Sequence, residues 1–133
     1  MKALSILQPW AHLIVCGEKT IENRTWYGGY RGPLLIHAGK SRRLMDDDLL
    51  EDLADSLFRC GDFPYDDIKF GAIVGQVKMI DCARVSQTVR PDREWAEGPW
   101  CFVLRNAERF SEPKAYRGQL GFFDIEVLEP TME

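Results

Sequence analysis

The sequence predicts an α+β fold that is mainly β: a small β-barrel of about five to six strands with two flanking helices. Three observations support this prediction. Short apolar or alternating segments recur along the chain and outnumber the helical patterns. No repeat, low-complexity stretch or linker divides the 133 residues, so we expect a single domain over 1–133. An apolar fraction of 45% and a charged fraction of 29% are ordinary for a globular protein.

The chain begins with a predicted strand and a predicted helix. Residues 3–7 are mostly apolar and predict a short strand. Pro9 follows, and proline is favoured in the first turn of a helix because its missing N–H would be unpaired there. Gly17 is a natural stop, so we expect the helix to open at Gln8 and to end at Gly17.

Residues 20–26 have the pattern of an extended segment with two mixed faces. Alternation places Thr20, Glu22, Arg24 and Trp26 on one face and Ile21, Asn23 and Thr25 on the other. Neither face is apolar enough to be buried cleanly in a core. We therefore interpret the segment as a strand that lines a cleft.

A turn at 30–33 leads into a predicted apolar strand over 34–38. Residues 46–58 predict the main helix, because acidic residues occupy its first turn, where the helix dipole favours them, and Gly61 ends it. Its predicted buried stripe consists of Leu49, Leu50, Leu53 and Leu57.

The second half of the chain predicts three more strands and one long loop. Strands are expected over 72–81, 100–104 and 121–128, and the last of these alternates apolar and acidic residues. In the first of them, Ile73, Val77 and Met79 should point inward. Residues 86–99 are polar and contain two prolines, and long loops in small domains are often functional.

The cysteines and histidines give no sign of a metal site. The four cysteines form no CxxC pair, and neither they nor the two histidines have the spacing of metal ligands. We therefore expect no metal ion and no cofactor. The apolar stretch near the start is too short to span a membrane and has no signal-peptide pattern, so we predict reduced thiols, a cytoplasmic location and no membrane partner.

The net charge of −4 argues against a large basic face for duplex DNA, so double-stranded DNA is not the expected main target. A local cluster of arginine and lysine still permits a small site for one or a few nucleotides.

The densest set of chemically useful side chains lies in residues 17–24, GEKTIENR. Lys19 brings a flexible positive charge. Glu22 can accept a hydrogen bond from an exocyclic amine, or act as a base when desolvated. Arg24 presents a planar fork of donors suited to phosphate or carboxylate, and it can stack on a base. The plainer alternative is that Glu22 and Arg24 form a structural ion pair on one strand face.

Three aromatic residues, Trp10, Trp26 and Tyr30, lie near this set in the sequence. Single-stranded RNA is commonly held by aromatic stacking and by hydrogen bonds to base edges, although each of these rings can equally belong to a core. Weaker candidates are Arg31, His37, which fits a satisfied core histidine, and Gln119, which suits a cleft or a turn. Acidic residues of the long loop, which we interpret as solvated charges, are Asp92, Glu94 and Glu97.

Several segments together resemble the ASCH domain. The resemblance is carried by ALSILQPW at 3–10, by the GxKxxExR pattern at 17–24 and by YRGPLLIHA at 30–38. It continues more loosely through 70–77 and 118–124. The GxKxxExR pattern is the most distinctive signature of the family. The chain is thus similar to a small, stand-alone ASCH protein of the PUA-like superfamily.

This resemblance implies a PUA-like β-barrel with an RNA-binding cleft beside the signature. It would place the signature residues in the cleft and add Gln8 to its walls. The full candidate set for ligand binding is Gln8, Trp10, Lys19, Glu22, Arg24, Trp26, Tyr30 and Arg31.

One branch of the family comprises amidohydrolases that remove the acetyl group from N4-acetylcytidine, and other members have been linked to RNA cleavage. In that branch the signature carries a catalytic lysine, a threonine three residues later and a glutamate from a later segment. This chain has Lys19 at the first position and Glu22 at the second. Glu94 and Glu97 lie in a suitable region for the third.

These observations leave three hypotheses. The first is a domain that binds single-stranded RNA or a modified nucleoside. The second is a hydrolase, acting on N4-acylated cytidine or cleaving RNA, with Lys19 and Glu22 as the catalytic pair. The third is a protein-interaction domain of an RNA-related complex, with a protein partner instead of a nucleotide ligand.

Overall fold

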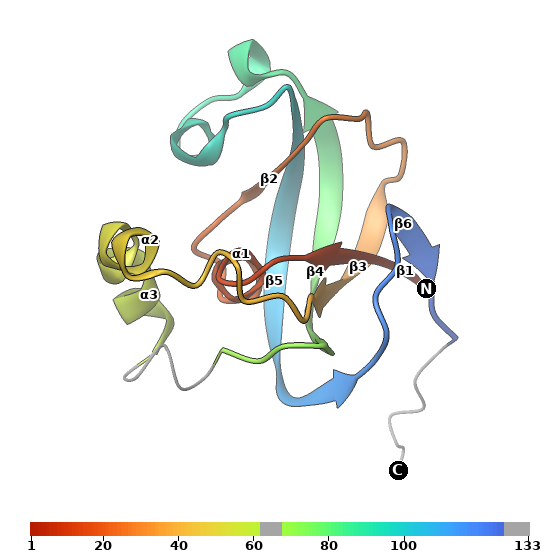
Figure 1. Ribbon diagram of the computed structural model, residues 1–133. Helices are drawn as coiled ribbons and strands as arrows, with labels where there is room; N and C mark the ends of the chain where they lie inside the picture. Colours follow the sequence, from red (N-terminus) through yellow and green to blue (C-terminus); the bar gives the residue numbers. More distant parts are fainter. Residues whose placement is uncertain (62–67, 127–133) are drawn as a thin grey trace.

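Two long antiparallel strands form the spine of the sheet in this computed structural model, which describes residues 1–61 and 68–126 (Figure 1). These are β4 (Ala72–Ala83) and β5 (Trp100–Ala115). The other strands are β1 (Lys2–Ile6), β2 (Ile21–Arg24), β3 (Gly32–Ala38) and β6 (Phe122–Asp124). Together they form a six-stranded sheet in the order β2-β5-β4-β3-β1-β6.

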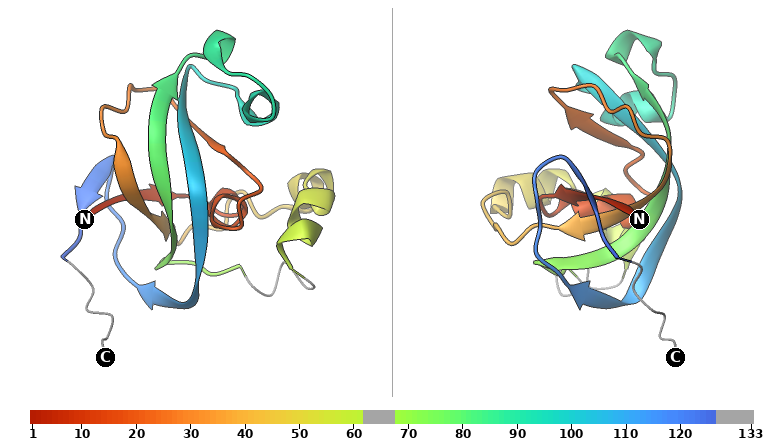
Figure 2. Two further views of the ribbon diagram at one scale, coloured as in Figure 1. Left: turned by 180° about the vertical axis from the view of Figure 1, so that it is seen from behind. Right: turned by 90° about the vertical axis from the view of Figure 1, so that its right-hand side faces the viewer.

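The sheet is antiparallel except where β1 runs parallel to β3. It curls into a half-barrel, as the side view of Figure 2 shows. Register shifts along β4 accompany this curl, since bulges increase the local twist of a strand. Gly75 occupies a crowded point of β4, where an added Cβ would lie 2.4 Å from the backbone oxygen of Glu108.

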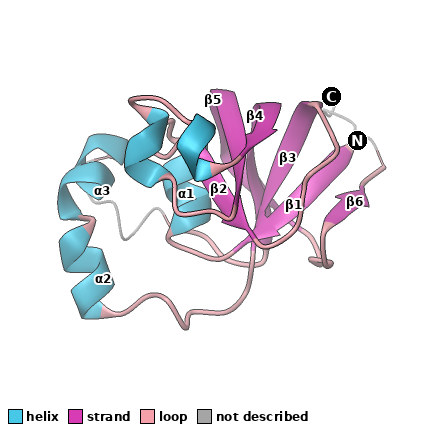
Figure 3. Cartoon of the chain, turned by 90° about the horizontal axis from the view of Figure 1, so that it is seen from above, coloured by secondary structure: helices cyan, strands magenta, loops and turns pink. Residues whose placement is uncertain are grey.

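The helices gather at one side of the sheet (Figure 3). α1 (Trp10–Val15) packs its apolar residues against the sheet, and Gly17 ends it with a positive φ of 87°. α2 (Asp47–Asp52) and α3 (Ala54–Cys60) lie beyond it. A cluster centred on Leu13 and Leu57 packs α3 against α1. No helix in the described part of the chain is long and apolar enough to cross a membrane.

The main core lies inside the curl of the sheet. Its largest buried side chains include Leu4, Ile14, Leu34, Met79 and Phe102. As predicted, Ile73, Val77 and Met79 of β4 are all buried. The predicted class, mainly β with flanking helices, is therefore confirmed.

Most element boundaries differ from the sequence predictions by only a few residues, and three elements differ in a more informative way. The helix expected over 46–58 divides at Leu53, whose φ of −97° and ψ of 7° leave the helical range while its N–H still bonds to Leu49. Three α-helices therefore replace the expected two among the described residues. β5 continues well beyond residue 104 through a polar segment. Hydrogen bonding to β4, rather than burial of an apolar face, keeps this segment extended. Of the strand expected over 121–128, the structure describes β6 and the two residues after it.

Candidate ligand-binding site around Lys19

Lys19 is the most unusual side chain of the signature, because it is a lysine with only 5% of its surface exposed. The chain leaves α1 through a turn in which the Lys19 N–H bonds to the Leu13 oxygen at 3.0 Å. Its ammonium donates a hydrogen bond to the backbone oxygen of Ile21. Two indole rings flank this ammonium, with the Trp10 centroid at 5.3 Å and the Trp95 centroid at 5.9 Å. The result is a desolvated cation within cation–π distance of two aromatic rings.

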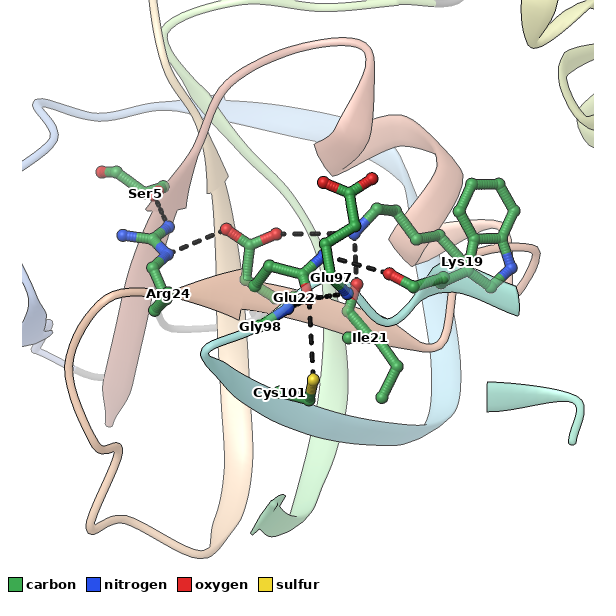
Figure 4. Close-up of polar contacts among 10 residues, drawn as sticks. Ser5, Lys19, Ile21, Glu22, Arg24, Glu97, Gly98 and Cys101 are labelled. Atoms are coloured by element: carbon green, nitrogen blue, oxygen red, sulfur yellow. Dashed lines mark hydrogen bonds and ion pairs between the residues drawn. The ribbon is translucent and has the colours of Figure 1, made fainter. Parts of the chain in front are cut away.

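Glu22 lies between two cations, and Figure 4 shows the three side chains in a row. Its Oε2 accepts a hydrogen bond from Arg24 Nε at 2.9 Å. Its Oε1 lies 3.8 Å from Lys19 Nζ, which is an ion-pair distance and longer than a hydrogen bond. The structural ion pair considered for Glu22 and Arg24 is therefore present, and Oε1 keeps the capacity to accept a further hydrogen bond.

Arg24 also closes the open side of the half-barrel. Its Nη2 donates to the backbone oxygen of Ser5 at 2.7 Å. β2 stands at one edge of the sheet, whereas β1, which carries Ser5, is separated from it by β5, β4 and β3 in the hydrogen-bonded order. The guanidinium thus joins two strands that the sheet itself does not pair.

Burial lowers the pKa of the Lys19 ammonium below its ordinary value, because the charged form loses its hydration. Glu22 and Glu97 oppose this effect by raising the pKa, and Arg24 adds to it as a nearby cation. The site therefore holds a lysine whose proton is less tightly bound than in solution, next to a buried carboxylate.

Asn23 attaches the long loop to this site. Its Oδ1 accepts hydrogen bonds from the backbone N–H groups of Glu97 at 2.8 Å and Gly98 at 2.9 Å. Its Nδ2 donates to the Trp95 oxygen at 3.0 Å. Asn23 lies between Glu22 and Arg24 in the sequence, on the opposite face of β2. One face of this short strand carries Glu22 and Arg24, and the other holds the loop that brings Trp95 close to Lys19.

A second anchor of the loop corrects one sequence interpretation. Asp92 was expected to be a solvated charge, but it is only 5% exposed. Its carboxylate accepts from Thr20 Oγ1 at 2.7 Å and from Arg105 Nη2 at 2.7 Å. Burial raises the pKa of Asp92, but the hydrogen bonds from Arg105 and Thr20 outweigh that effect and lower it. Glu94 and Glu97 are exposed, as expected.

Several of the predicted site residues come together here, namely Trp10, Lys19, Glu22 and Arg24. Trp26 lies next to this group, because the guanidinium carbon of Arg24 is 6.0 Å from the centroid of the Trp26 ring. Its indole packs edge-on against Phe102 and Phe122, so it is largely a core residue.

The remaining predicted residues have other contacts. Gln8 is buried, and its amide donates to the Lys69 oxygen at 2.7 Å and accepts from the His12 N–H at 2.8 Å. Arg31 donates to the Gly28 oxygen at 2.7 Å and pairs with Asp81. Both side chains thus have structural partners.

Tyr30 donates its hydroxyl hydrogen bond to the Pro33 oxygen. His37 is buried and hydrogen-bonds Ser5 Oγ at 2.9 Å and the Tyr116 oxygen at 2.6 Å, which confirms it as a satisfied core histidine. Gln119, expected at a cleft or a turn, lines a separate pocket of about 880 Å³ that Ser5 and His37 also border.

Sequence reasoning missed Trp95 and Asn23 as parts of the site. The signal for Trp95 was its position in a long polar loop, where a large aromatic residue is out of place unless it contacts the domain. Asn23 gave no local signal, because its partners lie more than seventy residues further along the chain.

The fold and the site define a class: a mainly β half-barrel domain in which a buried lysine, a buried glutamate and a half-buried arginine lie in a row beside a tryptophan-bearing loop. The family model of the ASCH domain matches residues 4–119. The chain therefore belongs to the ASCH domain family, and the resemblance found in the sequence is confirmed.

Among curated proteins, the chain is similar to activating signal cointegrator 1 of Homo sapiens and of Mus musculus, with 33% identity over 111 residues in each case. These matches cover 79% of this chain and only 19% of the relatives, so the chain spans about a fifth of the length of the proteins it resembles.

Among solved structures, the chain is similar to the ASCH protein of Zymomonas mobilis, with a TM-score of 0.52 and 14% identity over 94% of this chain and 87% of that one. A tyrosine-to-phenylalanine variant of the same protein gives a TM-score of 0.54, also at 14% identity, over 94% and 89% of the two chains. At this identity the likeness concerns the fold alone.

Proposed function

We propose that this domain binds single-stranded RNA or a modified nucleoside at the site around Lys19. The observation that carries the proposal is the position of the Lys19 ammonium near the rings of both Trp10 and Trp95, with Glu22 beside it. A buried lysine is costly to maintain, and clefts that combine such perturbed groups with aromatic walls are typical of binding sites.

Glu22 and Lys19 together suit a nucleobase that carries both hydrogen-bond donors and acceptors on one edge. Glu22 Oε1 is placed to accept from an exocyclic amine, while Lys19 Nζ is placed to donate to a ring nitrogen or a carbonyl. Cytosine offers both kinds of group, whereas uracil lacks the exocyclic amine. We therefore expect cytidine and its N4-modified forms to bind better than uridine.

The affinity should be modest. Stacking on an aromatic side chain contributes about 1–3 kcal/mol per base. The net charge of −4 gives little general attraction to a phosphate backbone, so binding should be micromolar at best and should favour single strands over duplex DNA.

Tryptophan fluorescence and thermal shift provide the test, with cytidine, uridine, N4-acetylcytidine and short single-stranded RNAs as ligands. Quenching by cytidine-containing ligands should disappear in Trp95→Ala and persist in Trp100→Ala. Trp100 is a fair control, because it is also half-buried but contacts Tyr27 and Arg84. Equal loss in both variants, or no ligand effect on the wild type, would contradict the proposal.

A second function, amide hydrolysis, is favoured by one observation: Glu97, from the loop, lies near enough to Lys19 to raise its pKa (Figure 4). Water would attack the acyl carbonyl of an N4-acylated cytidine, with Glu22 taking its proton and Lys19 stabilising the oxyanion. The C–N bond then breaks and the proton passes to the leaving amine, which yields the carboxylic acid and cytidine.

Turnover separates this reaction from binding alone. Incubation of N4-acetylcytidine with the wild type should release acetate, and Lys19→Met should abolish the release, because methionine keeps the buried stem but lacks the ammonium. Stabilisation by the nucleoside without acetate leaves the domain as a binding module. Absence of both effects would favour a protein partner.

A further inference from the structure

A second cluster of chemically reactive side chains, which is not part of the candidate site around Lys19, consists of His12, Cys16 and Cys60. His12 belongs to α1, Cys16 caps its C-terminal end, and Cys60 is the last residue of α3. One ligand atom from each residue lies within 4.8 Å of the other two. The sequence prediction of no metal rested on linear spacing, and the packing of α3 against α1 brings in the third residue.

One separation in this cluster, between His12 Nε2 and Cys16 Sγ, fits a tetrahedral metal site. Zinc bonds of about 2.3 Å to sulfur and about 2.1 Å to nitrogen, at tetrahedral angles, place the two ligand atoms about 3.6 Å apart. The measured separation of Cys16 Sγ and His12 Nε2 is 3.7 Å. Histidine and cysteine one helical turn apart lie on the same helix face, which explains how α1 supplies two ligands.

We propose that His12, Cys16 and Cys60 bind one zinc ion, with a water molecule as the fourth ligand. Two thiolates and one imidazole are the donors that zinc prefers, and a three-residue set leaves one coordination position open. The ion would fasten the end of α3 to the end of α1.

The surroundings of the cluster support this assignment. His12 is 3% exposed, while both cysteines are half-buried, so the imidazole is fixed and the thiols remain reachable from solvent. The Glu18 carboxylate, which is also nearby, is held by Arg59 at 2.8 Å and is therefore not the expected fourth ligand.

Cobalt substitution tests the site directly, because thiolate-bound cobalt(II) gives charge-transfer absorption that a non-thiolate site lacks. The full chain, reduced with a phosphine and freed of metal, is titrated with cobalt(II) and then with zinc. We expect one equivalent of cobalt to produce the band and zinc to displace it. Cys16→Ser and Cys60→Ser should each weaken the band, the double variant should lose it, and His12→Gln should weaken cobalt binding at least tenfold.

Cys82→Ser is the matched control, since Cys82 is a free cysteine outside the cluster, and this variant should keep the band. Circular dichroism shows whether each variant folds, and the wild-type titration does not depend on the variants. The proposal is overturned if the reduced wild type gives no charge-transfer band. It is also overturned if the band survives in the Cys16→Ser/Cys60→Ser double variant.

Discussion

Arg24 and Ser5 join the edge strand β2 to β1 across the open side of the curled sheet. The guanidinium Nη2 of Arg24, on the edge strand β2, donates to the backbone oxygen of Ser5 on β1 at 2.7 Å. The same side chain donates to Glu22 through Nε. One arginine of the signature therefore contributes both to the closure of the fold and to the charge balance of the site.

Replacing Arg24 should destabilise the domain. Arg24→Ala leaves the buried Glu22 carboxylate with Lys19 as its remaining ion-pair partner and the Ser5 oxygen without its donor. Hydrogen bonds that involve charged groups contribute about 1.5–3 kcal/mol each, so the free energy of unfolding in urea should fall by about that amount or more. Arg90→Ala is the control: it removes an exposed arginine that pairs with Glu94 at 3.8 Å, and it should change the free energy of unfolding little. Equal stability of Arg24→Ala and wild type would contradict the closing role.

The burial of Lys19 predicts a dependence of stability on pH. Its pKa in the folded protein is lowered from 10.5, so in the window between the two values the unfolded chain binds more protons. The free energy of unfolding should therefore rise as the pH increases through that window. Below the window Lys19 is charged in the folded protein, so the full cost of burying its charge is present.

Urea unfolding of the wild type and of Lys19→Met, from neutral pH up to 10.5, isolates this contribution. The difference in unfolding free energy should shift in favour of the wild type as the pH rises. Lys114→Met, at an exposed position of β5, is the control and should show no such trend. A difference that is independent of pH would contradict the lowered pKa.

Asn23 should control the order of the loop over the site. In Asn23→Ala, the backbone N–H groups of Glu97 and Gly98 lose their acceptor, and Trp95 loses a donor to its oxygen. Neutral hydrogen bonds contribute about 1 kcal/mol each, so amide exchange of these residues should accelerate about fivefold or more. Hydrogen-exchange mass spectrometry measures it, with peptides of β4 as the internal reference. Unchanged exchange in the 95–98 segment would refute this role.

The packing of α3 against α1 is tested by two neighbouring residues with opposite exposure. Leu57 is fully buried, whereas Phe58 is 71% exposed. Leu57→Ala should cost about 2–5 kcal/mol of unfolding free energy, because it removes buried methyl groups and leaves a cavity. Phe58→Ala should cost less than half as much. Urea unfolding compares the two, and a larger loss for Phe58→Ala would show that α3 is packed on its other face.

Local patterns in the sequence were enough to predict the class of fold and the proximity of the three charged residues at the candidate site. The alternation in 72–81 located β4, and the mixed faces of 20–26 identified β2 as a strand with polar side chains on both sides. Lys19, Glu22 and Arg24 share a short segment, so their proximity follows from local spacing.

What could not be predicted depends on contacts between distant segments. Asp92 looks solvated until Arg105 and Thr20 are placed beside it by β5 and β2. The polar half of β5 lacks alternation and is a strand only because β4 pairs with it. Cys60 reaches His12 and Cys16 only through the packing of two helices. Each of these features is set by tertiary structure, which overrides local preference.

The most direct test of the central claim is an NMR titration of the isotope-labelled chain with cytidine and, in parallel, with uridine. The account predicts that cytidine shifts the indole N–H signals of Trp10 and Trp95 and the backbone signals around Lys19, with uridine causing smaller shifts and Trp100 unaffected. Shifts confined to the pocket beside His37 and Gln119, or equal small shifts throughout the spectrum, would contradict the assignment of the ligand site to Lys19.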